Sequence, residues 1–369
     1  MLKRFLFLIC FLYFNSVFSQ QTSTTENNLN VSILTVGTAD ESHSLYGHTA
    51  LRIKDTNVHT DIVYNYGMFD FDTENFILKF VKGDLQYYAA AYPFDDFEYS
   101  YLLENRSIYE QVLNLSPQEK QLLSYKLNAN LYSEDRLYTY KFIDRNCTTK
   151  VIDIVNEVLE NKPIIKKNID SKTYRDVLYP YAENHFFQKL GINIIFGNKV
   201  DHTATKMFLP FDLYDNLKNT NYKNKPIVVE SKTIFEANRK PAHSFFDSIY
   251  ILIGILLLFV VLNKKAIIIS YFILLGLLGL LFSGIGFYSF HKELLWNYNV
   301  LLFNPLFILL IYFIIRNNTL WIKRISQICL FTLGVYVIFM FNKIHLLILL
   351  PIVVTTAVLL TRLIIKKVK

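Results

Sequence analysis

The pattern of hydrophobic and polar positions divides this chain of 369 residues into three parts. The first part begins with the basic pair Lys3 and Arg4, continues with an apolar run from Phe5 to Phe14, and ends in residues that a signal peptidase accepts. The apolar run is about half as long as the roughly 20 residues that a membrane-spanning helix needs. We therefore predict a cleaved signal peptide over residues 1–19 rather than an additional membrane helix.

The second part mixes strand and helix patterns over residues 20–242. Alternation of β-branched or aromatic residues with other residues predicts strands over residues 31–37, 48–53 and 61–67. A segment of this length is long enough to bury a core of its own. The sequence therefore predicts an exported α+β domain.

Two helices are predicted in the same part. Ser116, Pro117 and Glu119 supply the N-cap, the first-turn proline and the returning acidic residue of a capping box, which predicts a helix to about Leu131. Apolar residues at helical spacing predict a second helix that begins near Cys147.

The third part, residues 243–369, consists of apolar segments with short polar breaks. Backbone polar groups inside a bilayer must be satisfied within their own segment, so each segment is expected to be a helix. These features predict an all-α transmembrane domain of five helices, over residues 246–262, 266–289, 299–315, 325–341 and 346–362.

Basic residues in this third part predict its orientation. Lys292 and Lys343 lie in one set of connections between segments. The other connections and the C-terminal tail hold Lys264, Lys265, Arg316, Lys323, Arg324, Arg362, Lys366, Lys367 and Lys369. Because positive residues accumulate on the cytoplasmic side, we predict a multi-pass protein of the bacterial inner membrane with a periplasmic α+β domain and a cytoplasmic C-terminus.

The composition changes this picture little. Hydrophobic residues make up 52% of the chain, which is too apolar for an ordinary soluble protein. A net charge of +7 would suit a nucleic-acid partner. Much of that charge lies beside the membrane segments, however, and no aromatic-basic recognition motif accompanies it. We therefore predict the membrane, and no nucleic acid, as a partner.

The three cysteines fall one to each part of the chain: Cys10 in the signal peptide, Cys147 in the exported domain and Cys329 in a membrane segment. A disulfide bond within the exported domain is therefore impossible. An odd cysteine outside the cytoplasm indicates a reactive thiol or a partner in trans, and the alternative is an ordinary buried cysteine.

The position of Cys147 favours the reactive thiol. Asp144 and Asn146 are natural N-caps, so Cys147 is expected in a first helical turn, where unpaired N–H groups and the helix dipole stabilise a thiolate. The same N–H groups would stabilise an oxyanion when the thiolate attacks a carbonyl. Three polar residues in a row, Thr148 to Lys150, predict that this helix start faces solvent.

A cysteine nucleophile needs a base, and His48 is the best candidate. A strand would hold its ring rigidly, and Gly47 beside it permits close approach of a substrate. The alternative is a structural histidine at a strand edge. Four other histidines compete from loops or from segments without a clear pattern: His43, His59, His185 and His202. A zinc site of His43, His48 and His59 is a minor alternative, because no zinc motif surrounds them.

The neighbouring strand offers a third member for a catalytic triad. Asn65, or one of Tyr64 and Tyr66, would orient the imidazole of His48 if its side chain lies on the same face of the sheet. We select Asn65, although the sequence leaves the face undecided.

With these residues in place, the chain resembles a known family. The segments YGHTALRI, YNYGMFDF, FIDRNCTT and MFLPFDL, ahead of several membrane segments, resemble those of bacterial lipoprotein N-acyltransferases of the Lnb type. The resemblance implies a circularly permuted papain-like fold, in which the histidine strand precedes the cysteine helix. Asp201 matches a further motif position to which we assign no role.

The resemblance also implies an acyl transfer through a covalent intermediate. Cys147 would take a fatty acyl chain from a phospholipid as a thioester, and His48 would act as the base. The acyl chain would then pass to the α-amino group of a diacylglyceryl lipoprotein. We expect this chemistry to need neither a metal nor a cofactor.

Further residues are candidates for substrate binding. Arg145 would contact a phosphate or merely pair with Asp144. His291, Asn297 and Asn299 lie in the polar stretch HKELLWNYNVLLFNP, which would bind a head group or the acceptor amine, or would form an ordinary interfacial belt. Tyr46, two residues before His48, completes this group.

Two other functions compete with acyl transfer. The same Cys and His geometry would serve a cell-envelope cysteine peptidase or amidase of the NlpC type, although several membrane segments are more than a single anchor requires. A membrane scaffold without catalysis is the third hypothesis, and it predicts that Cys147→Ala leaves activity in cells intact.

Overall fold

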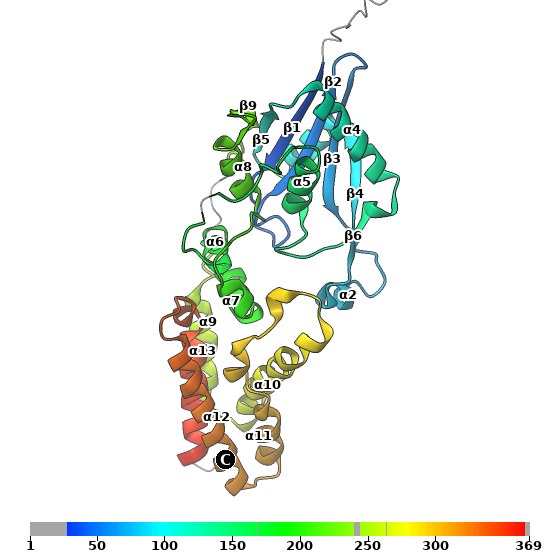
Figure 1. The fold of residues 1–369 in the computed structure, drawn as a ribbon. Helices are drawn as coiled ribbons and strands as arrows, with labels where there is room; N and C mark the ends of the chain where they lie inside the picture. The colour runs from blue at the N-terminus through cyan, green and yellow to red at the C-terminus, as the bar shows by residue number, and fades with distance from the viewer. Residues whose placement is uncertain (1–27, 168, 240–243, 263, 366–369) are drawn as a thin grey trace, which may run out of the picture.

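The computed structural model describes residues 28–167, 169–239, 244–262 and 264–365. The predicted signal peptide lies outside these residues. Figure 1 shows a domain built on a β-sheet, followed along the chain by a group of apolar helices. The α+β class predicted from the alternating patterns is therefore confirmed for the described residues.

Seven strands form one sheet, in the order β6-β4-β3-β2-β1-β5-β9, and every neighbouring pair is antiparallel. The strands are β1 (Leu29–Val36), β2 (His48–Asp55), β3 (Thr60–Met68), β4 (Gln86–Pro93), β5 (Ile108–Leu113), β6 (Leu137–Thr139) and β9 (Val228–Phe235). A short hairpin pairs β7 (Asn221–Tyr222) with β8 (Lys225–Pro226). The three predicted strands correspond to β1, β2 and β3.

The helices of this domain include both predicted ones. They are α2 (Phe76–Lys82), α3 (Phe94–Leu103), α4 (Pro117–Leu131), α5 (Cys147–Asn156), α6 (Tyr174–Leu178), α7 (Phe186–Ile195) and α8 (Pro210–Lys218). Short 3₁₀ turns are η1 (Glu134–Arg136), η2 (Tyr179–Ala182) and η3 (Asn198–Asp201). The capping box of α4 is present, since the Ser116 side chain accepts from the Glu119 N–H and the Glu119 side chain accepts from the Ser116 N–H.

The two faces of the sheet carry separate cores, because successive side chains of a strand point to opposite faces. On one face, Val31, Ile33 and Leu51 pack with the apolar positions of α4 and α5. On the other face, Leu34 and Val63 pack with the aromatic residues of α3. The sheet is thus held between α4 and α5 on one side and α3 on the other.

The described residues of the C-terminal part form five apolar helices around a common core. They are α9 (Ile249–Leu262), α10 (Lys265–Tyr288), α11 (Leu306–Ile315), α12 (Thr319–Met340) and α13 (His345–Ile365), with the turns η4 (Lys292–Leu294) and η5 (Tyr298–Leu301) between α10 and α11. Among the described residues, α10, α12 and α13 are long and apolar enough to cross a membrane. The stretch from η4 to α11 would make a fourth span if its two pieces, bent by 43°, count as one.

The predicted count of five spans is therefore not confirmed. The helix α9 has 14 residues and is shorter than the roughly 20 that cross a bilayer. The third predicted segment, residues 299–315, is interrupted after η5, where Asn304 and Pro305 precede α11. A proline at this position favours a new helix start over a continuous helix.

A buried polar network joins the sheet domain to the apolar helices. The guanidinium of Arg175 donates to Asp201 Oδ1 at 2.7 Å and to the Tyr298 hydroxyl oxygen at 3.2 Å. Tyr298 in turn donates to Asp201 Oδ2 at 2.7 Å, and its oxygen lies 2.7 Å from His345 Nε2 at the start of α13. Asp201 therefore has a structural place, at the junction of the two parts.

Candidate active site

Cys147 is the first residue of α5, and its neighbours fix the helix start. Asn146 is the N-cap: its side-chain oxygen accepts from the Thr149 N–H at 3.0 Å, and the Thr149 hydroxyl accepts from the Asn146 N–H at 2.8 Å. The Asn146 amide nitrogen also donates to the carbonyl oxygens of Phe142 and Phe208, at 2.8 Å each. Two chain segments thereby hold the thiol at a defined point above the sheet.

The expectation that this helix start faces solvent is wrong. Thr148 and Thr149 are buried, and only Lys150 is partly exposed. The hydroxyl oxygens of Thr148 and Thr49 lie 3.0 Å apart, which connects α5 to β2. Threonine hydroxyls are satisfied here by caps and by each other, so a polar sequence does not require contact with water.

His48 and Asn65 lie on the same face of the sheet. Asn65 pairs across the strands with Ala50, two residues beyond His48, so both side chains project to the side that α3 covers. His48 Nε2 lies 2.5 Å from Asn65 Oδ1, and the Asn65 amide nitrogen donates to the Tyr92 hydroxyl at 2.5 Å. The ring of Tyr101 in α3 stacks on the imidazole, with centroids 6.4 Å apart.

This network assigns the protons of the imidazole. Because the Asn65 amide nitrogen is used to donate to Tyr92, its oxygen is left to accept from His48 Nε2. Nε2 therefore carries the proton, and Nδ1 is free to accept one. An imidazole with a free Nδ1 is able to accept a proton as a base.

Gly67 allows the thiol and the imidazole to meet at the end of the sheet. A Cβ at this position would lie 3.7 Å from Cys147 Cβ and 4.0 Å from His48 Cε1. The φ of Gly67 is +100°, in the region that favours glycine, and the pairing of β3 with β4 shifts register here. The irregular strand end thus leaves the space between the two side chains open.

The surroundings of Cys147 favour its thiolate. Burial raises the pKa of the Cys147 thiol, whereas the charge of His48 and a hydrogen bond to it lower that pKa. The backbone N–H of Thr49 and the Thr148 hydroxyl lower it further, and the net pKa is below the ordinary value. A thiolate is the nucleophilic form of cysteine.

The thiol opens onto a cavity of about 420 Å³ with mostly aromatic walls. We call it the thiol cavity. Cys147 and His48 line it. Besides Tyr46, its aromatic side chains come from the segment after β3, from α2, from β4, from the loop before α5 and from the segment before α8: Phe69, Phe71, Phe76, Phe80, Tyr87, Tyr140, Phe142 and Phe208. Such a surface fits an apolar ligand better than a peptide backbone, whose polar groups would lack partners.

Of the two predicted substrate residues near the thiol, Tyr46 and Arg145, only Tyr46 lines the thiol cavity. The Tyr46 ring packs edge-on against Phe142. Arg145 is exposed, with its guanidinium 5.4 Å from the centre of the Tyr138 ring. The proposed pairing of Arg145 with Asp144 is not what the structure shows, because Asp144 binds the amino groups of Lys199 and Lys206.

The three predicted residues of the polar stretch lie away from Cys147. His291 Nε2 donates to the Phe80 carbonyl oxygen at 2.9 Å, at the outer end of the thiol cavity. Asn297 and Asn299 are buried and donate to carbonyl oxygens at the end of α7. Their amide groups thereby anchor η5 to α7, and neither residue lines the thiol cavity.

The competing histidines do not gather around His48. His59 lies in the turn after β2, at the opposite end of the strand from His48, while His43 lies on the rim of the thiol cavity. Within the described part of the chain, no group of three or more His, Cys, Asp or Glu side chains is placed to hold a metal ion.

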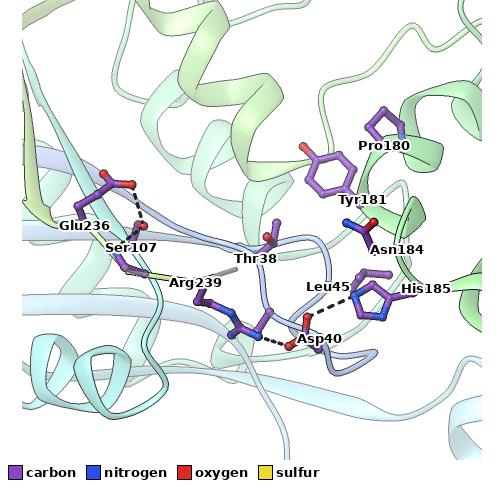
Figure 2. A pocket seen from close by; sticks show the side chains of 12 residues that line it. Thr38, Asp40, Leu45, Ser107, Pro180, Tyr181, Asn184, His185, Glu236 and Arg239 are labelled. Carbon is purple, nitrogen blue, oxygen red and sulfur yellow. Dashed lines mark hydrogen bonds and ion pairs between the residues drawn. The ribbon is translucent and has the colours of Figure 1, made fainter. Parts of the chain in front are cut away.

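A second cavity, of about 440 Å³, borders the same segment, residues 38–47, and carries charged side chains on its wall. We call it the polar cavity. Figure 2 shows Asp40 between Arg239 and His185, and Glu236 accepting from Ser107. The second nitrogen of the His185 ring lies 3.7 Å from Asp247. The charged groups of this cavity thus face one another.

Sequence reasoning missed two groups of residues at the site. The first is the pair that completes the histidine network, Tyr92 and Gly67, whose role depends on strand register. The second is the aromatic wall, whose members are separated by up to about 140 positions. The cluster of Phe69, Phe71 and Phe76 directly after a strand was the available signal.

These features define a class of protein: an α+β domain with a Cys–His–Asn cluster, joined to helices that are able to cross a membrane. Residues 18–179 match the family model of the Lnb N-terminal periplasmic domain. The match covers the N-terminal part of the chain, and it supports the resemblance that the sequence segments carry. No match was found among curated proteins or among solved structures. The circular permutation of a papain-like fold stays a prediction.

Proposed function

We propose that this protein moves a fatty acyl chain from a phospholipid, through a thioester on Cys147, to the N-terminal amine of a bacterial lipoprotein. The main support is that a thiol with a lowered pKa, beside a histidine, opens onto a cavity with aromatic walls. A nucleophile placed at the end of an apolar cavity suits an ester of a long acyl chain. The family match supports the same reaction class.

In the first half of the proposed reaction, His48 Nδ1 takes the proton of the Cys147 thiol. The thiolate then adds to the ester carbonyl carbon of the phospholipid, and first-turn N–H groups of α5 stabilise the oxyanion. When the ester C–O bond breaks, His48 returns its proton to the leaving lysophospholipid hydroxyl. Asn65 keeps the imidazole in the required orientation and tautomer.

In the second half, the lipoprotein amine adds to the thioester carbonyl carbon. His48 accepts a proton from the amine as the amide forms, and the C–S bond breaks to release Cys147 as a thiol or thiolate. No oxidant, metal or cofactor enters the balance. Two steps at one site suit a transfer between two bulky lipids.

The proposed location follows from charge and family. We place the sheet domain in the periplasm, the C-terminus in the cytoplasm and the helices in the inner membrane, after removal of residues 1–19. The domain limits 20–242 and 243–369, and the use of α9 and α11 as further spans, belong to this proposal.

The test is mass spectrometry of a lipoprotein N-terminus from cells that carry each variant. We expect Cys147→Ala and His48→Ala to leave diacylated lipoprotein, with each variant present in the membrane at the normal level. His185→Ala, in the polar cavity, is the matched control and should retain triacylation. Normal triacylation in the Cys147→Ala cells would refute the proposal. Cleavage of cell-wall peptides by the wild type, but not by Cys147→Ala, would favour a peptidase or amidase.

A further inference from the structure

The helix α2 exposes apolar side chains that a domain surrounded by water would be expected to bury. None of its seven residues is fully buried, and Ile77 and Leu78 are 73% and 59% exposed. Phe71, shortly before this helix, is also exposed. Contiguous exposed apolar residues of this kind usually mark a surface that contacts a protein or a membrane.

Hydrogen bonds fix α2 to the end of a candidate membrane span. The N–H of Phe290 donates to the Lys82 carbonyl oxygen at 2.7 Å, and the Ser289 hydroxyl donates to the Val81 carbonyl oxygen at 2.8 Å. Ser289 directly follows α10, which ends at Tyr288. Because this span end must lie at the membrane boundary, α2 lies there too. Figure 1 shows α2 at the lower edge of the sheet domain, beside the segment that follows α10.

Two sides of α2 have different neighbours. Phe76 and Phe80, four residues apart, have nearly parallel rings with centroids 6.3 Å apart, and both line the thiol cavity. Ile77 and Leu78 do not line the cavity and stay exposed. The helix therefore stands between the apolar cavity and the surroundings of the domain.

Charges around α2 suit a phospholipid surface. The amino groups of Lys82 and Lys141 lie 5.5 Å and 5.4 Å from the centre of the Phe290 ring, and Lys141 also donates to the Gly83 carbonyl oxygen. Lys79 adds a third positive side chain on the helix itself, and of the three only Lys82 is paired here with a carboxylate, that of Asp84 at 3.0 Å. Positive side chains at the height of lipid phosphates, next to exposed apolar ones, are typical of helices that lie in the interface of a bilayer.

We propose that α2 is an interfacial helix that inserts Ile77 and Leu78 into the outer leaflet and opens the thiol cavity to the bilayer between the rings of Phe76 and Phe80. An acyl chain would then pass from the leaflet to Cys147 without crossing water. The exposed apolar side of α2 thus contacts the phospholipid bilayer. That the transferred group is an acyl chain rests on the function proposed above, whereas the insertion of α2 into the bilayer does not.

The first experiment compares two ways of loading Cys147 in the reconstituted full chain. The variant Ile77→Glu/Leu78→Glu should load acyl groups from phospholipid vesicles at least about tenfold more slowly than the wild type, because two carboxylates oppose insertion. Loading from a water-soluble butyryl thioester should stay within about twofold. Leu122→Glu/Tyr125→Glu on α4 is the matched control, since these side chains are also exposed (44% and 71%), while Figure 1 shows α4 further than α2 from the apolar helices.

Equal loading of the α2 variant and the wild type from vesicles would overturn the inference. A wild type that loads from neither donor would instead contradict the proposed function, so a second measurement tests insertion by itself. In a Cys147→Ala background, a fluorophore on Leu78→Cys should be quenched by spin-labelled lipids at least about threefold more than one on Tyr125→Cys. The unlabelled background corrects for Cys329, and equal quenching at the two positions would exclude an interfacial α2.

Discussion

The thiol cavity and the polar cavity are similar in volume, at about 420 and 440 Å³, and both border the segment between β1 and β2. Their linings differ. The thiol cavity has aromatic walls and a Cys–His pair, whereas in the polar cavity Asp40 pairs with both Arg239 and His185. In the polar cavity the charged groups already have partners, which leaves less for a ligand to bind.

The comparison shows that volume does not identify a reactive site. His185 lies 3.3 Å from a carboxylate oxygen of Asp40 and 3.7 Å from one of Asp247, and among the described residues no cysteine lines its cavity. His48 instead has an amide on one nitrogen and a thiol near the other side of its ring. The apolar walls also select the ligand, because they accept hydrocarbon and reject uncompensated polar groups.

The largest expected effect separates the two histidines. We expect His48→Ala to slow the acylation of Cys147 by about 10²- to 10⁴-fold, the range of general base catalysis. His185→Ala should change the rate less than twofold. The measurement is the rate of acyl-enzyme formation with a soluble thioester, followed by intact-protein mass spectrometry. If both variants lose activity equally, the polar cavity belongs to the reaction and the distinction fails.

The second effect concerns the walls of the thiol cavity. For soluble acyl thioesters from four to eight carbons, kcat/KM should rise by up to about fourfold per methylene, because each buried methylene contributes about 0.8 kcal/mol. Asp40→Asn, in the polar cavity, should leave this slope unchanged. A flat series with the wild type would show that the acyl chain does not occupy the aromatic cavity.

The third effect concerns the orientation of His48. Asn65→Ala removes the acceptor of the imidazole N–H, and we expect acylation to slow by about fivefold, since one such hydrogen bond contributes roughly 1 kcal/mol. Asn65→Asp keeps an acceptor oxygen and should retain more of the rate. Asn184→Ala, in the polar cavity, is the control. Near-normal turnover of Asn65→Ala would mean that another group orients the ring.

Much of the fold could be predicted because local patterns determine it. Alternation gives the ends of β1, β2 and β3 to within two residues, and the capping box around Ser116 fixes the start of α4. Local patterns say less about whether an apolar helix is long enough to cross a bilayer, since apolarity alone did not distinguish the 14-residue α9 from the longer α10. A short apolar helix and a span have the same composition.

The site was predictable only as far as single residues carry chemistry. Cys147 stood out because it is the only cysteine of its domain and follows a strong N-cap. Asn65 could be predicted as the partner of His48 only if its side chain lies on the same face of the sheet as His48. That face depends on the strand register, which the sequence does not give. The burial of Thr148 was missed because its partner, Thr49, lies 99 positions away in the chain. Packing partners distant in sequence leave no local pattern.

The smallest effect is a pH shift in the reactivity of the thiol. Because the pKa of Cys147 is lowered, its alkylation by iodoacetamide should rise with a midpoint at lower pH than that of an ordinary cysteine. His48→Ala removes the charge and hydrogen bond that lower the pKa, so the midpoint should move to higher pH. His185→Ala should leave it in place, and Cys147→Ala provides the blank. Coincident midpoints for wild type and His48→Ala would show that the thiolate owes nothing to the imidazole and that the helix start alone stabilises it.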